Sequence, residues 1–235
     1  MSAEFAPTRA TVRPVVVEAR LDEPLSRWLW LVKWLLAIPH YIVLWALSLV
    51  YVVLSIVAAI AILFTGRYPR GIFDFNVGVL RWSWRVAYYS YGALGTDRYP
   101  PFTLDDVPDY PARLEVEYPG ELARWPVLFK WWLLAIPHYV IIGLFLGGFK
   151  YAAFPSLGLI GVLALIAGVA LAAVGRYPRG IFGLLVGLDR WVLRVVVYAS
   201  LMTDVYPPFR LDQGGTEPGA EDLGGEQVGQ PAAVA

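Results

Sequence analysis

The chain has 235 residues, of which 58% are hydrophobic and 16% are charged, whereas about 25% of the residues in soluble proteins are charged. Its formal net charge is zero, so its charge gives no support to nucleic acid as a partner. It contains no cysteine, which excludes disulfides, thiolate metal ligands and a cysteine nucleophile. This composition indicates an integral membrane protein.

Four motifs occur twice, in the same order. In their two positions they are Leu-Leu-Ala-Ile-Pro-His-Tyr (35–41 and 133–139), Gly-Arg-Tyr-Pro-Arg-Gly-Ile-Phe (66–73 and 175–182), Arg-Trp with a further arginine (81–85 and 190–194) and Tyr-Pro-Pro-Phe (99–102 and 206–209). Four matches in one order predict a tandem duplication with a unit of roughly one hundred residues. We place repeat 1 at residues 14–106 and repeat 2 at residues 112–212.

Both ends of the chain are polar. Residues 1–13 form a polar segment, and charged residues continue to Arg27 before any apolar run begins. A secretory signal needs its apolar core directly after a short basic start, so we expect the first apolar segment to remain as an anchor. Residues 213–235 are rich in Gly, Pro, Glu and Ala and lack a periodic apolar pattern, which predicts a disordered tail.

Four short pieces outside the apolar runs have the pattern of extended chain. Residues 15–21 and 113–118 alternate apolar and charged positions, which predicts half-buried strands. Residues 99–104 and 206–211 contain the two Pro-Pro pairs, and a residue before proline is pushed out of the helical region. We predict that these four pieces pair in a small cytoplasmic β-element.

The longest apolar runs predict two transmembrane hairpins. In repeat 2, residues 126–148 and 156–174 are each long enough to cross a bilayer, and the residues between them form a turn. In repeat 1, residues 25–64 leave just enough room for two spans, with a turn at 48–51. A single long helix or a shallow re-entrant hairpin is the alternative there, and the similarity of the repeats favours the hairpin.

The third segment of each repeat, residues 72–94 and 181–201, is amphipathic. At helical spacing its polar and small residues form one stripe in each copy, namely Asp74, Gly78, Arg81 and Arg85, then Gly183, Gly187, Arg190 and Arg194. An arginine in mid-span costs roughly 2.5–3.5 kcal/mol, so we expect these helices to lie in the interface, although spanning is the alternative. All Lys and Arg except Lys150 then fall on one side, which predicts that both termini are cytoplasmic.

The sequence therefore predicts an all-α integral membrane fold of two tandem repeats. Each repeat is expected to be a transmembrane helical hairpin plus an interfacial amphipathic helix, with short cytoplasmic β-strands. Within the first span of each repeat, His40 and His138 follow a proline. They are candidates for an intramembrane proton acceptor or ligand contact, or they satisfy carbonyls that the prolines free. Two histidines without a nearby carboxylate are too few for a metal, and we expect no cofactor.

Arginines provide the second group of candidates. Arg67, Arg70, Arg176 and Arg179 stand where an apolar run ends, which suits anionic lipid headgroups or a phosphate-bearing ligand. The structural alternative is a cap that stops the helix on the cytoplasmic side and turns the chain. The stripe arginines Arg81, Arg85, Arg190 and Arg194 are further lipid candidates, or they form an ion-paired network with residues such as Asp74.

The four motifs resemble those of a bacterial membrane family catalogued as domain of unknown function 4389, present here in two tandem copies. The resemblance implies a multi-span bacterial membrane protein and brings no activity with it. Catalytic and phosphate-loop motifs are absent from the sequence, so we do not expect an enzyme. We expect an inner-membrane module that binds anionic lipid, a membrane protein partner or a second copy through its arginine-rich cytoplasmic face. The alternative is a small transporter or channel with a site between the repeats, near His40 and His138.

Overall fold

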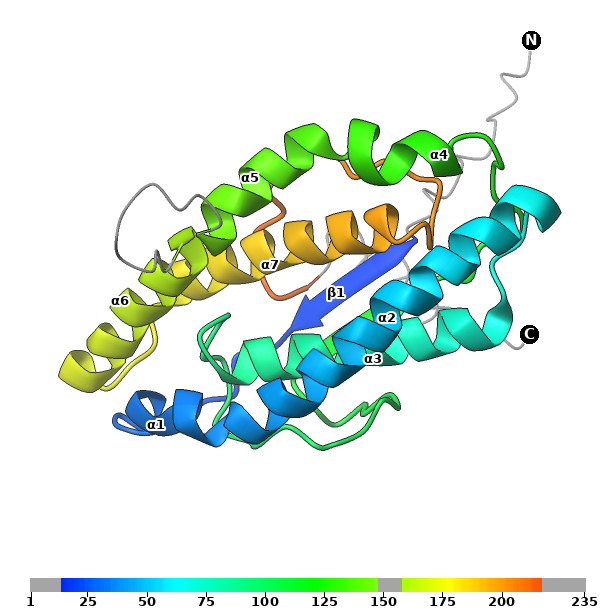
Figure 1. Cartoon of the computed structure of the whole chain (residues 1–235). Coiled ribbons are helices and arrows are strands. Elements are labelled where there is room, and N and C mark those ends of the chain that lie inside the picture. Colours follow the sequence, from blue (N-terminus) through cyan, green and yellow to red (C-terminus); the bar gives the residue numbers. More distant parts are fainter. Residues whose placement is uncertain (1–13, 148–157, 217–235) are drawn as a thin grey trace, which may run out of the picture.

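The computed structural model describes residues 14–147 and 158–216 and is mostly helical, as predicted (Figure 1). Its elements are β1 (Val15–Ala19), α1 (Trp30–Leu36), α2 (Ile38–Thr65), α3 (Arg70–Tyr89), β2 (Ala112–Val116), α4 (Val127–Phe129), the π-helix η1 (Lys130–Leu134), α5 (Ile136–Leu146), α6 (Gly158–Val174) and α7 (Arg179–Ala199). We refer to residues 14–106 as the first half and to residues 112–212 as the second half. The predicted polar segment 1–13, the predicted turn around Lys150 and the tail beyond residue 216 lie outside the described residues.

The first half contains one long apolar helix, not a hairpin. α2 runs uninterrupted for 28 residues through the turn predicted at 48–51. After Pro39 it has no glycine, proline or charged residue until it ends at Gly66, whose φ of 72° caps the helix, so nothing in the sequence breaks it. Only 11% of its most apolar window is buried, and by length and composition α2 is able to cross a membrane.

The hairpin predicted for the second half is also wrong. α5 ends at Gly147 and α6 begins at Gly158, and a Cβ added to Gly158 would lie 2.4 Å from the Gly147 nitrogen, so the two helix ends touch. α6 continues the path of α5 and does not fold back along it (Figure 1). With 11 and 17 residues, α5 and α6 together match the length of α2. Taken together, α4, η1 and α5 are also long and apolar enough to cross a membrane, although the helical path bends by 45° between η1 and α5.

The spacing of the motifs locates the difference between the halves. His40 precedes Arg67 by 27 positions, whereas His138 precedes Arg176 by 38. The difference of eleven equals the separation of Gly147 and Gly158 along the chain. The second half therefore carries its additional residues at the point where α5 and α6 meet, and the helical path on either side is kept.

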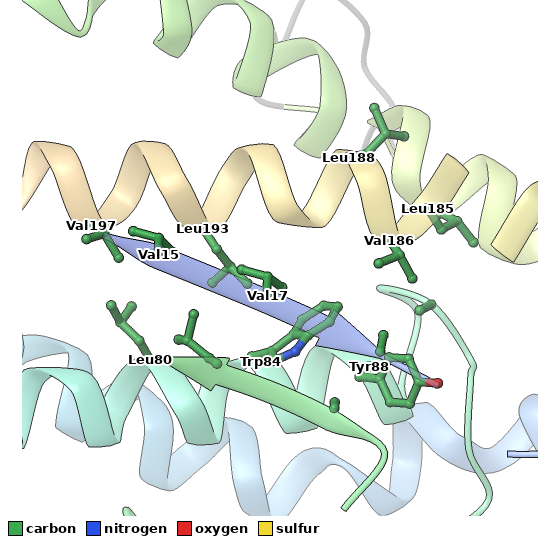
Figure 2. Close-up of a cluster of buried hydrophobic side chains, with 14 of the residues drawn as sticks. Val15, Val17, Leu80, Trp84, Tyr88, Leu185, Val186, Leu188, Leu193 and Val197 are labelled. Atoms are coloured by element: carbon green, nitrogen blue, oxygen red, sulfur yellow. The ribbon is translucent and has the colours of Figure 1, made fainter. Parts of the chain in front are cut away.

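The two strands form an antiparallel ribbon in which Val17 lies opposite Leu114. β1 of the first half packs on α7 of the second half, whereas β2 of the second half packs on α3 of the first. Figure 2 shows Val15 and Val17 of β1 directed into a core shared with these two helices. Within the described residues the sheet has only these two strands, so the Pro-Pro segments do not join it as predicted.

The helices and the ribbon form three layers. α2 packs on α3, and α3 packs on β2; likewise α6 packs on α7, and α7 packs on β1. The outer layer of α1, α2 and α4–α6, which we call the apolar layer, exposes large hydrophobic side chains along its length. The opposite face of the molecule is the outward face of the ribbon, where Arg113 and Glu115 form an ion pair with side chains about half exposed.

The start of the predicted disordered tail is ordered. The Ala19 amide donates to the Gly215 carbonyl at 2.9 Å, and the Gly214 amide donates to the Gly183 carbonyl at 3.2 Å. Residues 213–216 therefore extend along β1 and cross the start of α7. A glycine is required at position 215, because an added Cβ would lie 2.1 Å from the Ala19 carbonyl oxygen.

Candidate functional site

The arginines of the two Gly-Arg-Tyr-Pro-Arg-Gly motifs are exposed, while the tyrosine between them is buried in both halves. Arg70 pairs with Asp74 at 3.9 Å and Arg179 with Glu23 at 3.3 Å, and all four side chains are well exposed. The predicted network of Asp74 with the stripe arginines is not formed. Within the described residues, the guanidinium groups of Arg67 and Arg176 have neither a hydrogen-bond nor an ion-pair partner, which leaves them available to a ligand.

The two motifs lie at opposite ends of the apolar layer (Figure 1). At one end α2 stops beside the start of α4, where the Leu122 amide donates to the Gly66 carbonyl at 2.9 Å. Each end also holds a third arginine, because a Cβ added to Gly66 would contact Arg124 and one added to Gly175 would contact Arg27. The structure thus gathers two groups of three arginines: Arg67, Arg70 and Arg124, and then Arg176, Arg179 and Arg27. We call them the arginine ends.

The stripe arginines Arg81 and Arg190 contact the ribbon, not the surroundings of the protein. Arg81 Nε donates to the Leu114 carbonyl at 3.0 Å, and Arg190 Nε donates to the Val17 carbonyl at 3.0 Å. Arg190 is fully buried. Each guanidinium therefore fixes the central residue of the strand that belongs to the other half, and headgroup contact does not fit the buried Arg190.

The second pair of stripe arginines holds the segments that follow Tyr-Pro-Pro-Phe. Arg85 is buried and donates to the Asp105 carbonyl at 2.8 Å, and Arg194 donates to the Asp212 carboxylate at 2.7 Å. Burial alone raises the pKa of Asp212, but the hydrogen bonds and charges of Arg194 and Arg210 together outweigh it and hold this pKa below its ordinary value. The helical stripe was predicted correctly, and its partners are protein groups.

Each candidate histidine lies in an aromatic cluster of its own half. His40 is fully buried, its Nδ1 accepts a hydrogen bond from Trp82 Nε1 at 3.1 Å, and its ring stacks on Phe102 at 3.9 Å. The second half builds the same cluster from His138, Trp191 and Phe209. Three of the repeated motifs thus meet at each histidine. The rings around each histidine belong only to its own half, so the predicted site that unites the two histidines is not formed.

Removing the indole donors tests whether these clusters are structural. Trp82→Phe and Trp191→Phe each leave a buried imidazole nitrogen without its donor, so we expect each to lower the free energy of unfolding by about 1 kcal/mol. Denaturant unfolding of the purified chain in detergent measures this. Trp45→Phe is the control, because Trp45 is 68% exposed and is expected to change little. Unchanged stability in both cluster variants would contradict a structural role.

Two buried lysines were missed by the sequence reasoning. Lys33 Nζ donates to the Thr96 carbonyl at 2.7 Å and forms an ion pair with Asp97 at 2.9 Å. Lys130 forms the corresponding pair with Asp204. The sequence does contain a pattern that indicates these pairs. Each lysine is the only charged residue in its apolar run, and each aspartate lies two positions before the tyrosine of a Tyr-Pro-Pro-Phe motif.

The π-helix η1 explains how the second lysine keeps its partner. Lys130 lies seven positions before Pro137, whereas Lys33 lies six positions before Pro39. A π-helix accommodates one additional residue per turn, so η1 absorbs the difference and leaves Lys130 facing Asp204.

The first half also matches a known family. Residues 27–103 match the family model described as Domain of unknown function (DUF4389). The match supports the resemblance seen in the motifs, and it contains all four motifs of the first half. No curated protein and no solved structure matches the chain. The description of the family assigns no activity, so a function has to be argued from the geometry.

Proposed function

We propose that the chain is a duplicated, non-enzymatic module of a bacterial inner membrane that binds anionic lipid headgroups through its two arginine ends. The observation that carries this proposal is the exposure of Arg67, Arg70, Arg176 and Arg179 at the ends of the apolar layer. The tyrosine inside each motif is buried and anchors the turn, so the flanking arginines project from a fixed backbone. Each exposed guanidinium group close to an anionic membrane surface contributes about 1 kcal/mol to the free energy of binding.

The layers favour an orientation in which α2 and the path of α5 and α6 lie in the plane of one leaflet. These two helical paths run in opposite directions, so spanning would place the arginine ends on opposite sides of the membrane (Figure 1). Spanning would also bring the ribbon, which contacts the middle of α3 and α7, to mid-membrane depth. There each charged side chain costs roughly 2.5–3.5 kcal/mol.

We call the arrangement in which these helices lie in the plane of one leaflet the flat orientation, and in it each part of the protein surface meets surroundings of matching polarity. The apolar layer faces hydrocarbon, the arginine ends reach the headgroups at both ends of that layer, and Arg113 and Glu115 of the ribbon face the cytoplasm. All described basic residues then lie on one side of the hydrocarbon, as the positive-inside rule requires. We include the duplication in this proposal because corresponding residues of the two halves make the same contacts: an arginine donates to a strand carbonyl, and a tryptophan donates to a histidine.

Vesicle flotation tests the proposal. The variant Arg67→Gln, Arg70→Gln, Arg176→Gln, Arg179→Gln is expected to bind neutral phosphatidylcholine vesicles as the natural chain does, because its apolar layer is intact. It is expected to lose the additional affinity for vesicles that contain phosphatidylglycerol, and this loss should disappear at high salt, where the natural chain loses the same preference.

The matched control replaces with glutamine four exposed arginines that do not belong to the arginine ends, namely Arg20, Arg98, Arg113 and Arg210. This control has the same net charge as the test variant and is expected to keep its preference for anionic vesicles. If the two variants behave alike, or if the motif variant keeps the natural preference, the arginine ends do not form a lipid site. A protein partner or a purely structural cap would then account for them.

A further inference from the structure

A cavity of about 390 Å³ lies where the two halves meet. Its walls come from both halves, with Tyr41 and Leu44 of α2, Phe145 of α5 and Ile160 of α6 in the apolar layer. Ser83 of α3 and Asp189 of α7 line it from the layer beneath. Its volume falls within the range of about 300–1,000 Å³ that is usual for small-molecule sites.

Among the described residues that line this cavity, Asp189 is the one that is charged. The residue is 8% exposed, and its Oδ2 has no hydrogen-bond partner among the described residues. Burial raises the pKa of this carboxyl well above its ordinary value. A buried carboxyl group without a hydrogen-bond or ion-pair partner destabilises the fold, so its presence requires an explanation other than stability.

The first half shows that the fold does not need an acid at this point. Asp189 directly precedes Arg190, and the residue that directly precedes Arg81 is Leu80. Leu80 is buried in the hydrophobic core at the corresponding turn of α3. The carboxyl is therefore specific to the second half, where it faces the cavity.

We propose that this cavity binds an amphiphile that carries one ammonium group on a hydrocarbon chain, with Asp189 as its counter-ion. Among the described residues, no lysine or arginine lines the cavity, so no described side chain supplies the missing cation, and an ammonium ligand would supply it. The hydroxyls of Tyr41 and Ser90 are already joined at 2.8 Å, and Ser90 also donates to a backbone carbonyl. The Tyr91 hydroxyl donates to the Trp30 carbonyl at 3.0 Å, which leaves Ser83 as the second polar contact. The remaining walls are mostly apolar and fit the chain.

The depth of Asp189 and of the apolar walls in the membrane fits a ligand with a charged head and a hydrocarbon chain. Asp189 belongs to α7, in the layer that lies beneath the apolar layer. In the flat orientation this layer lies at headgroup depth, and the walls from α2, α5 and α6 lie in hydrocarbon. An amphiphile can then place its amine on Asp189 and its chain toward the bilayer centre. The site is distinct from the arginine ends and does not depend on them.

Binding of dodecylamine to the full chain, purified in a non-ionic maltoside, tests the proposal. We expect saturable binding, followed by tryptophan fluorescence and by a rise in the unfolding temperature. Dodecanol, which has the same chain without the charge, should bind at least about tenfold more weakly. Asp189→Leu, which installs the residue of the first half, should lose at least about tenfold in affinity for dodecylamine while unfolding at a higher temperature than the natural chain.

A second variant keeps the Asp189 carboxyl group and fills the cavity. Ser83→Phe fills the cavity from α3 and is expected to abolish dodecylamine binding, and it decides the question if Asp189→Leu does not fold. The four-arginine variant should bind dodecylamine normally, which separates this site from the proposed lipid surface. Equal binding of dodecylamine and dodecanol, or undiminished dodecylamine binding by the Asp189 and Ser83 variants, would overturn the proposal.

Competition in nanodiscs then identifies the source of the amine. If phosphatidylethanolamine, added to phosphatidylcholine nanodiscs, weakens dodecylamine binding to the natural chain but has no such effect on Asp189→Asn, the ligand is an aminoethyl lipid headgroup. If dodecylamine binds equally well in both kinds of nanodisc, the ligand is a free amphiphilic amine.

Discussion

Residues 14–111, expressed without the second half, are expected not to give a folded monomer. α3 of this fragment is covered by β2, which the fragment lacks, and β1 loses both α7 and its ribbon partner. The buried side chains Val17 and Trp84 would become exposed, and Arg81 would lose the Leu114 carbonyl. The same argument applies to residues 112–216, so neither half contains the strand that covers its own amphipathic helix.

Co-expression provides the measurement. Two separate chains, 14–111 with an affinity tag and 112–216 without one, should co-purify as a one-to-one complex that unfolds cooperatively. Either fragment alone should aggregate or pair with itself, because the ribbon register is symmetrical about Val17 and Leu114 and admits a second copy of the same strand. A monomeric fragment with a cooperative unfolding transition, by light scattering and circular dichroism, would show that the halves are independent.

This exchange of strands marks where prediction from the sequence stops. Alternating apolar and charged residues identified both strands, because a half-buried strand repeats every two positions. Their partners are helices of the opposite half, and no local pattern encodes a contact at that separation. The prediction of two hairpins was wrong for a related reason. Hydropathy gives the length of an apolar run but not the direction in which the following helix runs.

The candidate site was predicted in part. Exposure of Arg67 and Arg176 agrees with their position at the end of an apolar run. The stripe on α3 and α7 was also correct as geometry, but a backbone carbonyl and a lipid phosphate both accept hydrogen bonds from a guanidinium, so the sequence alone does not identify the partner. Asp189 could have been found by aligning the halves on Arg81 and Arg190, which places it opposite Leu80.

Arg190→Met is expected to be the most damaging single substitution on the helical stripes. The Arg190 guanidinium is fully buried and donates to the carbonyls of Val17, at 2.9 Å, Asp212, at 2.5 Å, and Gly214, at 3.1 Å. Methionine fills similar space but removes the hydrogen bonds that the guanidinium donates to these carbonyls. We expect a loss of about 3–5 kcal/mol in the free energy of unfolding, and Arg190→Lys should recover part of it.

Arg81→Met is the matched comparison, because Arg81 occupies the corresponding turn of α3 and donates to Leu114 while remaining half-buried. Its expected cost is about 1–2 kcal/mol, since water can satisfy the groups that it leaves. Denaturant unfolding in detergent measures both variants, and limited proteolysis should show residues 212–216 released only in Arg190→Met. If instead both variants unfold like the natural chain and both lose binding to anionic vesicles, the stripe contacts headgroups as the sequence first suggested, and the ribbon is held by its apolar side chains alone.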